Sequence, residues 1–528
     1  MNKKIRTYFF RRYERSEAIR NVCIKWIASS YRPINDVFIL LLTAFSLFGQ
    51  AVHAEIRTYH YPAEVKASQA YSLKVDGIPV MVIDNPVPSS FAAFELQQGP
   101  VTVEIACSQD VKWVDVRPLS AGITPQIKDG KIWFTIPSPG HYTVELNGKL
   151  NHPLFIFADP VEEKPSKTDP DVIYFEAGKL HQAGVIHPKS NQHVFIEGGA
   201  VVVGAISATG VENILVSGHG VMDGSFNNRL SKNESVFTSL EGFKDDDNQY
   251  QMFVEFIDSK NITIKGLILN NGTTWQVVPI NCENVTVDGL KLISDNPSDD
   301  GIDIVRSRKV TVRNCFVRVK DDCIAIKAHL KYSETVIVDD VLVENCIFWN
   351  AAWGNGLEIG FELLCAEVKN ITFRNCDIIH VESGAVFSIH NSDRATVKNV
   401  LYEDIRVEDA RQKLVDLAIF RSQYCADGST DPEYIRNNYL HGAWDGVLKV
   451  DPEKREYHAR FRGKIENIRF NNIHIYGNLP FSIIAGYDDN HQVTDVTFSN
   501  IYLNGQKITS LERLKIFMEN AQGVQLDN

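Results

Sequence analysis

The residues from Lys309 onward read KVTVRNCFV, and the pattern returns as DVLVENCIF from Asp340 and as NITFRNCDI from Asn370. The copies begin 340 − 309 = 31 and 370 − 340 = 30 residues apart. Each copy offers a short β-branched strand, a bend, and a second short strand, with no long helix between copies. Strands of this kind cannot bury a face alone and must stack on the next copy. The pattern predicts a right-handed parallel β-helix.

Further copies extend the array in both directions. Their first residues are Asn213, Asn261, Asn284, Asn399, Asn467 and Asp495. The steps of 261 − 213 = 48 and 467 − 399 = 68 residues indicate two turns each, the second with an insertion at Asp409–Arg462. A second set of apolar strands predicts another sheet along the array, at residues 275–278, 301–304, 322–326, 356–359, 385–389 and 481–484. Cys315, Cys346 and Cys376 recur at one repeat position, which predicts a buried ladder of thiols and few or no disulfides.

The N-terminal part of the chain has a different pattern. Alternating strands such as VTVEIACS, KIWFTIP and HYTVELNG are separated by Gly, Pro and Asp turns over residues 55–160, which predicts a small antiparallel β-sandwich. The polar residues 161–171 are then a linker, and residues 172–528 form the β-helix. The fold class is therefore all-β.

Residues 1–54 resemble a signal peptide. The apolar stretch Val37–Gly49 follows basic residues and precedes the small-residue pattern Val52-His53-Ala54, so we expect cleavage after Ala54. The stretch is shorter than the roughly 20 apolar residues of a spanning helix. An uncleaved anchor is the alternative, but we expect a secreted or periplasmic protein with no membrane span after cleavage.

Composition restricts the partners. The chain has 528 residues, 44% hydrophobic and 23% charged, and a formal charge of −12. An acidic protein repels phosphate, so nucleic acid is not an expected partner. We expect a monomer.

The densest group of acidic residues is Asp299-Asp300-Gly301-Ile302-Asp303, followed by Asp321-Asp322. Asp300 and Asp321 are 321 − 300 = 21 residues apart, close to one turn, so they are expected on neighbouring rungs. Crowded carboxylates raise one another's pKa, and a protonated acid beside ionised partners is what glycosidic cleavage needs. A calcium site or a solvated acidic rim is the alternative.

The first of these segments resembles the N-T-D-G-x-D motif of glycoside hydrolase family 28, the polygalacturonases. Residues 320–327 (KDDCIAIK) resemble that family's D-D-C-I-A-I-K block, and the resemblance extends over residues 172–505. It implies that Asp321 is the general acid and that Asp300 and Asp322 activate a water on the opposite face, with inversion. Chemistry by carboxylates and water needs no cofactor, and we expect no metal.

Two positions depart from that family. Gly354-Asn355-Gly356 stands where the family has G-H-G, so Asn355 replaces a histidine. The family's R-I-K motif, which holds the galacturonate carboxylate, falls near Ala385–His390, where there is neither Arg nor Lys. Without that cationic clamp, the sugar at the cleavage point is expected to be neutral.

Other residues are expected to line the cleft and bind the substrate, a polysaccharide or oligosaccharide. These are Glu358, Asn355, Lys327, His390, Trp275, Trp353 and Asp303. Each has a plainer interpretation as a solvated charge, a core aromatic or a structural histidine. The insertion Asp409–Arg462 and the loop Asn227–Tyr250 are expected to wall the cleft, which favours short substrates or exo action.

A second resemblance concerns the domain order. The sandwich with Val116-Arg117-Pro118 and Leu154–Pro160, together with the tail Asn504–Thr509, resembles glycoside hydrolase family 49, the dextranases and isopullulanases. That family is similar to family 28 in fold and mechanism and also lacks the clamp.

Two other classes also use a β-helix. A polysaccharide lyase would need Ca²⁺ ligands and a basic residue near the uronate, for which Arg306 and Lys327 are the nearby candidates. A non-catalytic carbohydrate-binding adhesin would leave the aspartate trio without a role.

Overall fold

The computed structural model describes residues 55–85, 87, 89–223, 252–272, 274–439 and 447–527. The predicted signal peptide and the predicted cleft loop at residues 227–250 lie outside these residues. Among the described residues, no helix is both long and apolar enough to cross a membrane.

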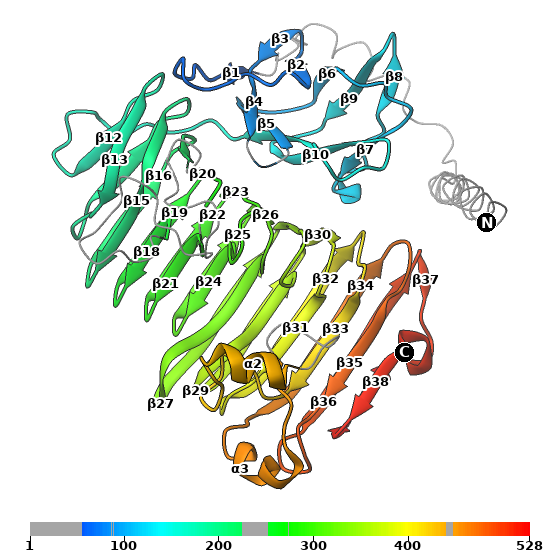
Figure 1. Ribbon diagram of the computed structural model, residues 1–528. Coiled ribbons are helices and arrows are strands. Elements are labelled where there is room, and N and C mark those ends of the chain that lie inside the picture. Colours follow the sequence, from blue (N-terminus) through cyan, green and yellow to red (C-terminus); the bar gives the residue numbers. More distant parts are fainter. Residues whose placement is uncertain are drawn as a thin grey trace, which may run out of the picture. The chain divides into compact units, whose positions relative to one another are not determined.

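The N-terminal part forms two packed β-sheets (Figure 1). One sheet comprises β1 (Ile56–Thr58), β4 (Val82–Asn85), β5 (Ser89–Leu96), β7 (Val114–Arg117), β10 (Gly140–Leu146) and β11 (Leu154–Asp159). The other comprises β2 (Tyr71–Val75), β3 (Ile78–Val80), β6 (Val101–Cys107), β8 (Gln126–Lys128) and β9 (Lys131–Ile136). All strand pairs in them are antiparallel except β5 with β11, because β11 inserts between β5 and β10. The predicted sandwich is present, with this one parallel pair.

The rest of the described chain is a parallel β-helix with three stacks of strands. The first stack contains β12 (Val172–Phe175), β14 (His193–Ile196), β16 (Glu212–Ser217), β19 (Lys260–Lys265), β22 (Glu283–Asp288) and β25 (Arg308–Arg313). The second contains β13 (Leu180–Ile186), β15 (Val201–Thr209), β18 (Val254–Ile257), β21 (Val277–Ile280), β24 (Ile302–Val305), β31 (Ala385–Asn391), β33 (Lys413–Ile419), β35 (Phe481–Ala485) and β38 (Ile516–Glu519).

The third stack contains β17 (Val221–Asp223), β20 (Ile268–Asn270), β23 (Lys291–Ile293), β26 (Phe316–Val319), β28 (Ile347–Asn350) and β30 (Asp377–Val381). Longer strands run through a corner from one stack into the next: β27 (Ile324–Glu344), β29 (Leu357–Arg374), β32 (Thr396–Val407), β34 (Lys464–Ile475) and β36 (Val493–Leu503). The remaining short strands are β37 (Gln506–Lys507), β39 (Ala521–Gln522) and β40 (Gln525–Asp527), and the short helices are α2 (Pro432–Asn438), α3 (Arg455–Ala459) and the 3-10 helices η1 (Leu119–Ala121), η2 (Pro452–Lys454) and η3 (Leu511–Leu514).

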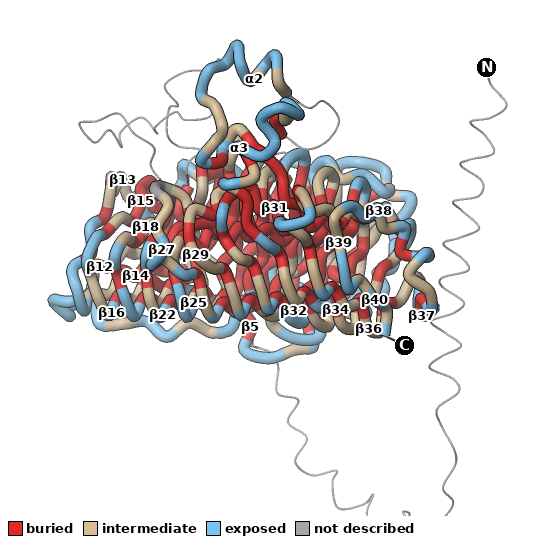
Figure 2. The backbone as a smooth tube through the Cα atoms, turned by 90° about the horizontal axis from the view of Figure 1, so that it is seen from below, coloured by how far each residue is buried: buried red, intermediate tan, exposed pale blue. Residues whose placement is uncertain are grey.

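The core follows from the register of the repeat. In the first stack, Val310 pairs with Val341, which pairs with Ile371 and then Val400, and all four are buried in one apolar cluster. Figure 2 shows this buried interior running the length of the β-helix. Stacked β-branched side chains pack well on a pleated surface, so each rung buries the apolar face of its neighbour.

The first residue of every repeat copy adopts a left-handed conformation. The nine φ values lie between 55° and 61°, at Asn213, Asn261, Asn284, Lys309, Asp340, Asn370, Asn399, Asn467 and Asp495. Asn tolerates this conformation better than most residues. Asn284 Nδ2 donates to Asn261 Oδ1 at 2.8 Å, and Asn467 Nδ2 donates to Asn399 Oδ1 at 2.8 Å. The asparagines therefore shape the bend and also connect successive rungs.

The predicted thiol ladder is confirmed. Cys315, Cys346 and Cys376 are fully buried, and the backbone N–H of Cys315 donates to Cys346 Sγ at 3.4 Å. In the part of the chain that the structure describes, all eight cysteines are free thiols.

The sandwich packs on the third stack of the β-helix. Phe155 and Phe157 form an apolar cluster with Phe316 and Trp349. Ion pairs also cross this interface. They are Lys291 with Asp159 (2.8 Å), His380 with Glu145 (2.6 Å) and Arg117 with Glu408 (2.5 Å).

We predict that Asn284→Ala lowers the free energy of unfolding by about 1–3 kcal/mol, because alanine pays for the left-handed backbone and loses the hydrogen bond to Asn261. Asn284→Gly should cost about 1 kcal/mol or less, because glycine adopts this backbone freely. Urea-unfolding midpoints of the two variants check this. Equal losses in both would show that the backbone conformation contributes nothing.

Candidate active site

Three aspartates from two neighbouring rungs meet at the start of the second stack. Asp300 lies 302 − 300 = 2 residues before β24, and Asp322 lies 324 − 322 = 2 residues before β27. These strands pair in parallel with Ile302 opposite Ile324, so the two aspartates are stacked. Carboxylate oxygens of Asp300, Asp321 and Asp322 lie within 4.8 Å of one another. The structure therefore brings together the three carboxylates that the sequence places on adjacent rungs.

Burial and mutual repulsion change how these groups hold protons. Burial raises the pKa of Asp321 well above its usual range, and the charge of Asp300 raises it further. Burial likewise raises the pKa of Asp322, with added repulsion from Asp300 and Asp321. Asp300 instead accepts a hydrogen bond from Lys327 Nζ at 3.0 Å. The rung of Asp321 and Asp322 thus has carboxyl groups with raised pKa values, whereas Asp300 on the neighbouring rung is paired with the ammonium group of Lys327.

Asp299 fixes the loop that carries Asp321. Its Oδ1 accepts from the backbone N–H groups of Lys320 (2.9 Å) and Asp321 (3.0 Å), and its Oδ2 accepts from that of Asn296 (2.9 Å). Burial raises the pKa of Asp299 to about 7, although these donors act to lower it. This positioning role was not assigned from the sequence, where Asp299 was only one member of an acidic run.

Asn355 binds Asp322 directly. Its backbone N–H donates to Asp322 Oδ1 at 2.6 Å, and its Nδ2 donates to the same oxygen at 3.1 Å. Its own Oδ1 accepts from the backbone N–H of Ala385 at 2.9 Å. Asn355 therefore orients one of the three carboxylates.

Lys327 lies buried beneath the aspartates. Its Nζ is 3.0 Å from Asp300 Oδ2, 3.4 Å from Asp303 Oδ1 and 4.1 Å from the centre of the Trp275 ring. Burial alone would lower the pKa of Lys327, but Asp300 and Asp303 raise it well above its usual range. Lys327 is therefore a fixed cation covered by Trp275, not a solvated lysine.

A column of acidic residues continues along the second stack. Pairing places Asp303, Glu358 and Asp416 in one column, with Ala325 and Ser388 between them. All three acids are fully buried. Burial and the nearby Asp300 raise the pKa of Asp303 well above its usual range.

His390 joins this column from the adjacent position. Its Nδ1 is 3.0 Å from Glu358 Oε2, its Nε2 is 3.3 Å from Asp416 Oδ2, and its ring stacks on Phe361 at 5.0 Å. Burial acts to lower the pKa of His390, but Glu358 and Asp416 raise it to about 9. The sequence predicts that His390, Glu358 and Asp303 bind the substrate. The structure instead buries all three completely, because they pair with other buried charges.

Trp353 and Trp349 differ in exposure. Trp353 is 50% exposed beside Asp321, and Lys320 Nζ lies 4.6 Å from the centre of its ring. Its open ring can still stack on a sugar, as predicted. Trp349 is fully buried against Phe155 of the sandwich, and its Nε1 donates to Glu382 at 2.9 Å.

The insertion at residues 409–462 is described in part. Figure 2 shows α2 and α3 projecting from the strands near β31. Phe420 contacts both Phe361 and His390, at ring-centre distances of 5.6 Å each. Asp393 accepts from the backbone N–H of Ala426 in the insertion at 2.9 Å. The base of the insertion therefore closes over His390, while its predicted effect on substrate length stays a prediction.

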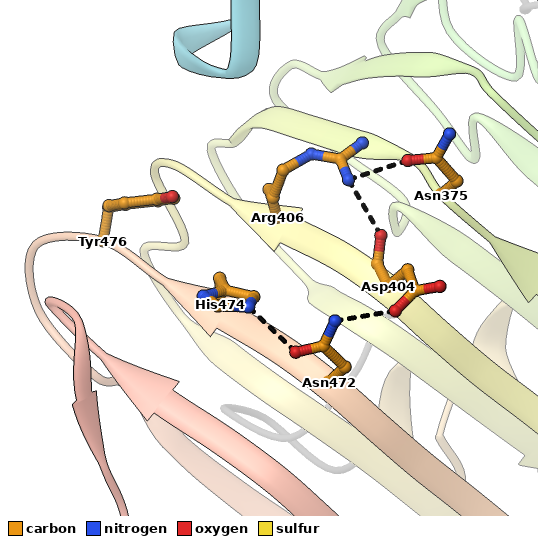
Figure 3. Close-up of a pocket in the computed structure, with 6 residues that line it drawn as sticks. All are labelled: Asn375, Asp404, Arg406, Asn472, His474 and Tyr476. Atoms are coloured by element: carbon orange, nitrogen blue, oxygen red, sulfur yellow. Dashed lines mark hydrogen bonds between the residues drawn. The ribbon is translucent and has the colours of Figure 1, made fainter. Parts of the chain in front are cut away.

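A polar groove of about 340 Å³ lies elsewhere on the β-helix (Figure 3). It is lined by Asn375, Asp404, Arg406, Asn472, His474 and Tyr476. Its polar groups bond one another: Arg406 donates to Asn375 Oδ1 at 2.9 Å, and Asn472 donates to Asp404 Oδ1 at 2.7 Å. None of the three clustered aspartates contributes to it, so this groove is separate from the carboxylate cluster.

Fold and site together define a parallel β-helix protein with a buried cluster of carboxyl groups on adjacent rungs. Residues 191–433 match the family described as glycosyl hydrolases family 28. The chain is 22% identical over 311 residues to a polygalacturonase of Juniperus ashei, covering 58% of this chain and 52% of the relative. It is 23% identical over 270 residues to one of Chamaecyparis obtusa, covering 50% and 44%. Residues 191–433 are thus similar to glycoside hydrolase family 28, and the chain spans about half the length of these relatives.

Solved structures support the fold. The exopolygalacturonase of Thermotoga maritima superposes with a TM-score of 0.50 at 18% identity, over 68% of this chain and 83% of that one. The match to Dex49A from Penicillium minioluteum covers 89% of this chain and 96% of that one at 13% identity, with a TM-score of 0.45, which does not establish a common fold. The resemblance to family 49 stays a prediction.

We predict that Gly354→Ala lowers any activity that depends on Asp321 by about 100-fold, because small displacements of catalytic groups have effects of this size. A Cβ at Gly354 would lie 2.5 Å from the carbonyl carbon and Oδ1 of Asp321. Gly289→Ala is the matched control: its φ of +65° nearly equals the +64° of Gly354, but nothing lies within 4 Å. Equal loss of kcat in both variants would contradict the steric explanation.

We predict a pH-dependent stabilisation by His390. Its pKa of about 9 in the folded chain exceeds the unfolded value of about 6.5, so its contribution is full below about pH 6.5 and is lost as the pH rises through about 9. The difference in unfolding free energy between the wild type and His390→Asn should therefore shrink from pH 6 to pH 9.5. Urea unfolding at several pH values measures this, with exposed His187→Asn as control. A difference that stays constant with pH would contradict it.

Proposed function

We propose that this protein is a glycoside hydrolase that cleaves O-glycosidic bonds of a polysaccharide or oligosaccharide. The observation that carries the proposal is the trio Asp300, Asp321 and Asp322, whose carboxylate oxygens lie within 4.8 Å of one another. Burial raises the pKa of Asp321 and Asp322, and a protonated carboxyl group beside an ionised one can serve as acid and base in glycosidic cleavage. The match of residues 191–433 to family 28 supports the same chemistry.

In the proposed mechanism, Asp321 is the general acid. It gives its proton to the glycosidic oxygen as the bond from that oxygen to the anomeric carbon breaks. Asp300 and Asp322 hold a water that attacks the anomeric carbon, and the proton released by this water passes to that pair. Asn355 and Lys327 orient the two carboxylates. No step needs a cofactor.

Inversion at the anomeric carbon is the finer part of this proposal. Oxygens within 4.8 Å are closer than the roughly 6.5–9.5 Å common in inverting enzymes, and nearer to the roughly 5–5.5 Å of retaining ones. We propose inversion because Asp300 and Asp322 together offer a water site beside the acid, and because the family resemblance implies it.

We further propose that the sugar at the cleavage point is neutral. The family's cationic clamp would fall near Ala385–His390, where there is neither Arg nor Lys, and Ser388 and His390 of this stretch are fully buried. Neither can meet a uronate carboxylate in an open cleft. The relatives named polygalacturonase favour galacturonan as the alternative substrate. Export by the predicted signal peptide would bring the protein to such polymers.

We predict that Asp321→Asn lowers kcat by about 10²–10⁴-fold, because the amide cannot donate a catalytic proton. Reducing-sugar release measures this on dextran, pullulan and homogalacturonan, with exposed Asp489→Asn as control. Proton NMR of the first product gives the anomer, and the inverted anomer is expected.

The outcomes separate the parts of the proposal. Release from a neutral glycan alone supports the absence of a uronate clamp, whereas release from homogalacturonan overturns that part and keeps the catalytic assignment. Activity that survives Asp321→Asn would falsify the assignment itself. A retained anomer would instead make one carboxylate a nucleophile.

A further inference from the structure

A second cluster of ionisable side chains lies where three segments of the chain meet. Glu95 belongs to β5 of the sandwich, Glu162 to the segment that follows β11, and His219 to the turn between β16 and β17 of the β-helix. One donor atom from each lies within 4.8 Å of the others. His219 Nδ1 is 3.5 Å from Glu95 Oε1 and 3.9 Å from Glu162 Oε1.

Glu162 has an unusual environment for an acidic residue. Its side chain is only 6% exposed, and neither carboxylate oxygen accepts a hydrogen bond of normal geometry. Burial raises the pKa of Glu162 and the charge of Glu95 adds to this, while the interaction with His219 and the backbone N–H groups of Gly198 and His219 act to lower it. Buried carboxylates are ordinarily paired or bound to a metal.

The nearby basic side chains do not neutralise the carboxylates of Glu95 and Glu162. Arg57 Nη1 lies 3.8 Å from Glu95 Oε2, but Arg57 is half-exposed and is paired at 2.8 Å with Glu55. His219 is the one base within 4.0 Å of Glu162 among the described ion pairs. Two buried carboxylates therefore converge on a single imidazole nitrogen.

We propose that Glu95, Glu162 and His219 Nδ1 bind a divalent transition-metal ion of the zinc type, which joins the sandwich, the linker and the β-helix. Carboxylate oxygens and an imidazole nitrogen suit Zn²⁺, at about 2.0–2.2 Å from the ion. Ligands of a tetrahedral ion at these distances are about 3.4 Å apart, so the observed 3.5 and 3.9 Å require only a small closure.

Tyr59 is the group that competes with the ion. Its hydroxyl lies 3.0 Å from His219 Nδ1, so the ion replaces this hydrogen bond. The hydroxyl can then donate to a bound carboxylate, as groups around metal ligands commonly do. The site is independent of the aspartate trio, and the proposal does not rest on the proposed function.

The test is a titration of the intact, chelator-treated protein with Zn²⁺ by calorimetry. All titrations use the Asp321→Asn background, so that the aspartate trio does not supply a second carboxylate site. We expect one ion per chain and a rise in the melting temperature. Glu162→Gln and His219→Gln should each weaken binding at least 10-fold. Glu176→Gln, an exposed glutamate paired with Lys167 and Lys179, should leave binding unchanged.

Other results would overturn the proposal. No Zn²⁺ binding, or equal binding in Glu162→Gln, would show that these three side chains do not hold an ion. Stronger binding of Ca²⁺ than of Zn²⁺ would exclude the imidazole as a ligand. Should the variants fail to fold, the visible spectrum of the Co²⁺-loaded parent decides: bands of a four-coordinate ion with a nitrogen ligand are expected, and their absence refutes the site.

Discussion

Parallel in-register stacking is the constraint on which the rest of this structure depends. Each rung places its residues over the same positions of the next, at a spacing of about 4.8 Å. Apolar residues gain from this, as in the column from Val310 to Val400, and asparagines gain a ladder of side-chain hydrogen bonds. Stacked carboxylates are destabilised instead, because like charges repel across such a short distance. Acidic residues on adjacent rungs therefore require cations, protons or both.

In the candidate active site, the acidic residues are stabilised both by neighbouring cations and by bound protons. Lys327 and His390 lie buried among the acids, while Asp321, Asp322 and Asp303 have raised pKa values. Proton affinities that acid–base chemistry requires thus arise from the architecture itself. Buried charges of this kind lower stability unless each is paired, so the apolar stacks on either side must supply the stabilisation that the acidic column removes.

The sequence predicts much of the molecule that depends on local spacing. The repeat determines the β-helix, and the 21-residue step from Asp300 to Asp321 is close to one turn, so their meeting follows. The prediction of two turns for the steps of 48 and 68 residues is wrong, because β16 pairs directly with β19 and β32 directly with β34, so each step is one turn with an insertion. The partner of His390 was missed, because Asp416 lies in the apolar strand KLVDLAI. Aligning the strands GIDI, GLEI and LVDL puts Asp303, Glu358 and Asp416 at one position, a signal that could have found the column. The burial of this acidic column depends on how the insertion at residues 409–462 folds, and the spacing of the repeats does not predict that fold.

Contacts between the sandwich and the β-helix are harder to predict from the sequence, because their partners are far apart in the chain. Arg117 and Glu408, for example, are 291 residues apart. Their interface combines an aromatic cluster with buried ion pairs. Aromatic packing tolerates sliding, whereas a buried pair such as Lys291 with Asp159 is satisfied in one geometry only, and a charge left alone would be costly. The ion pairs thus select one docking geometry out of several that the aromatic surface would accept. The glutamates that lie near His219 extend the same polar contacts to the beginning of the β-helix.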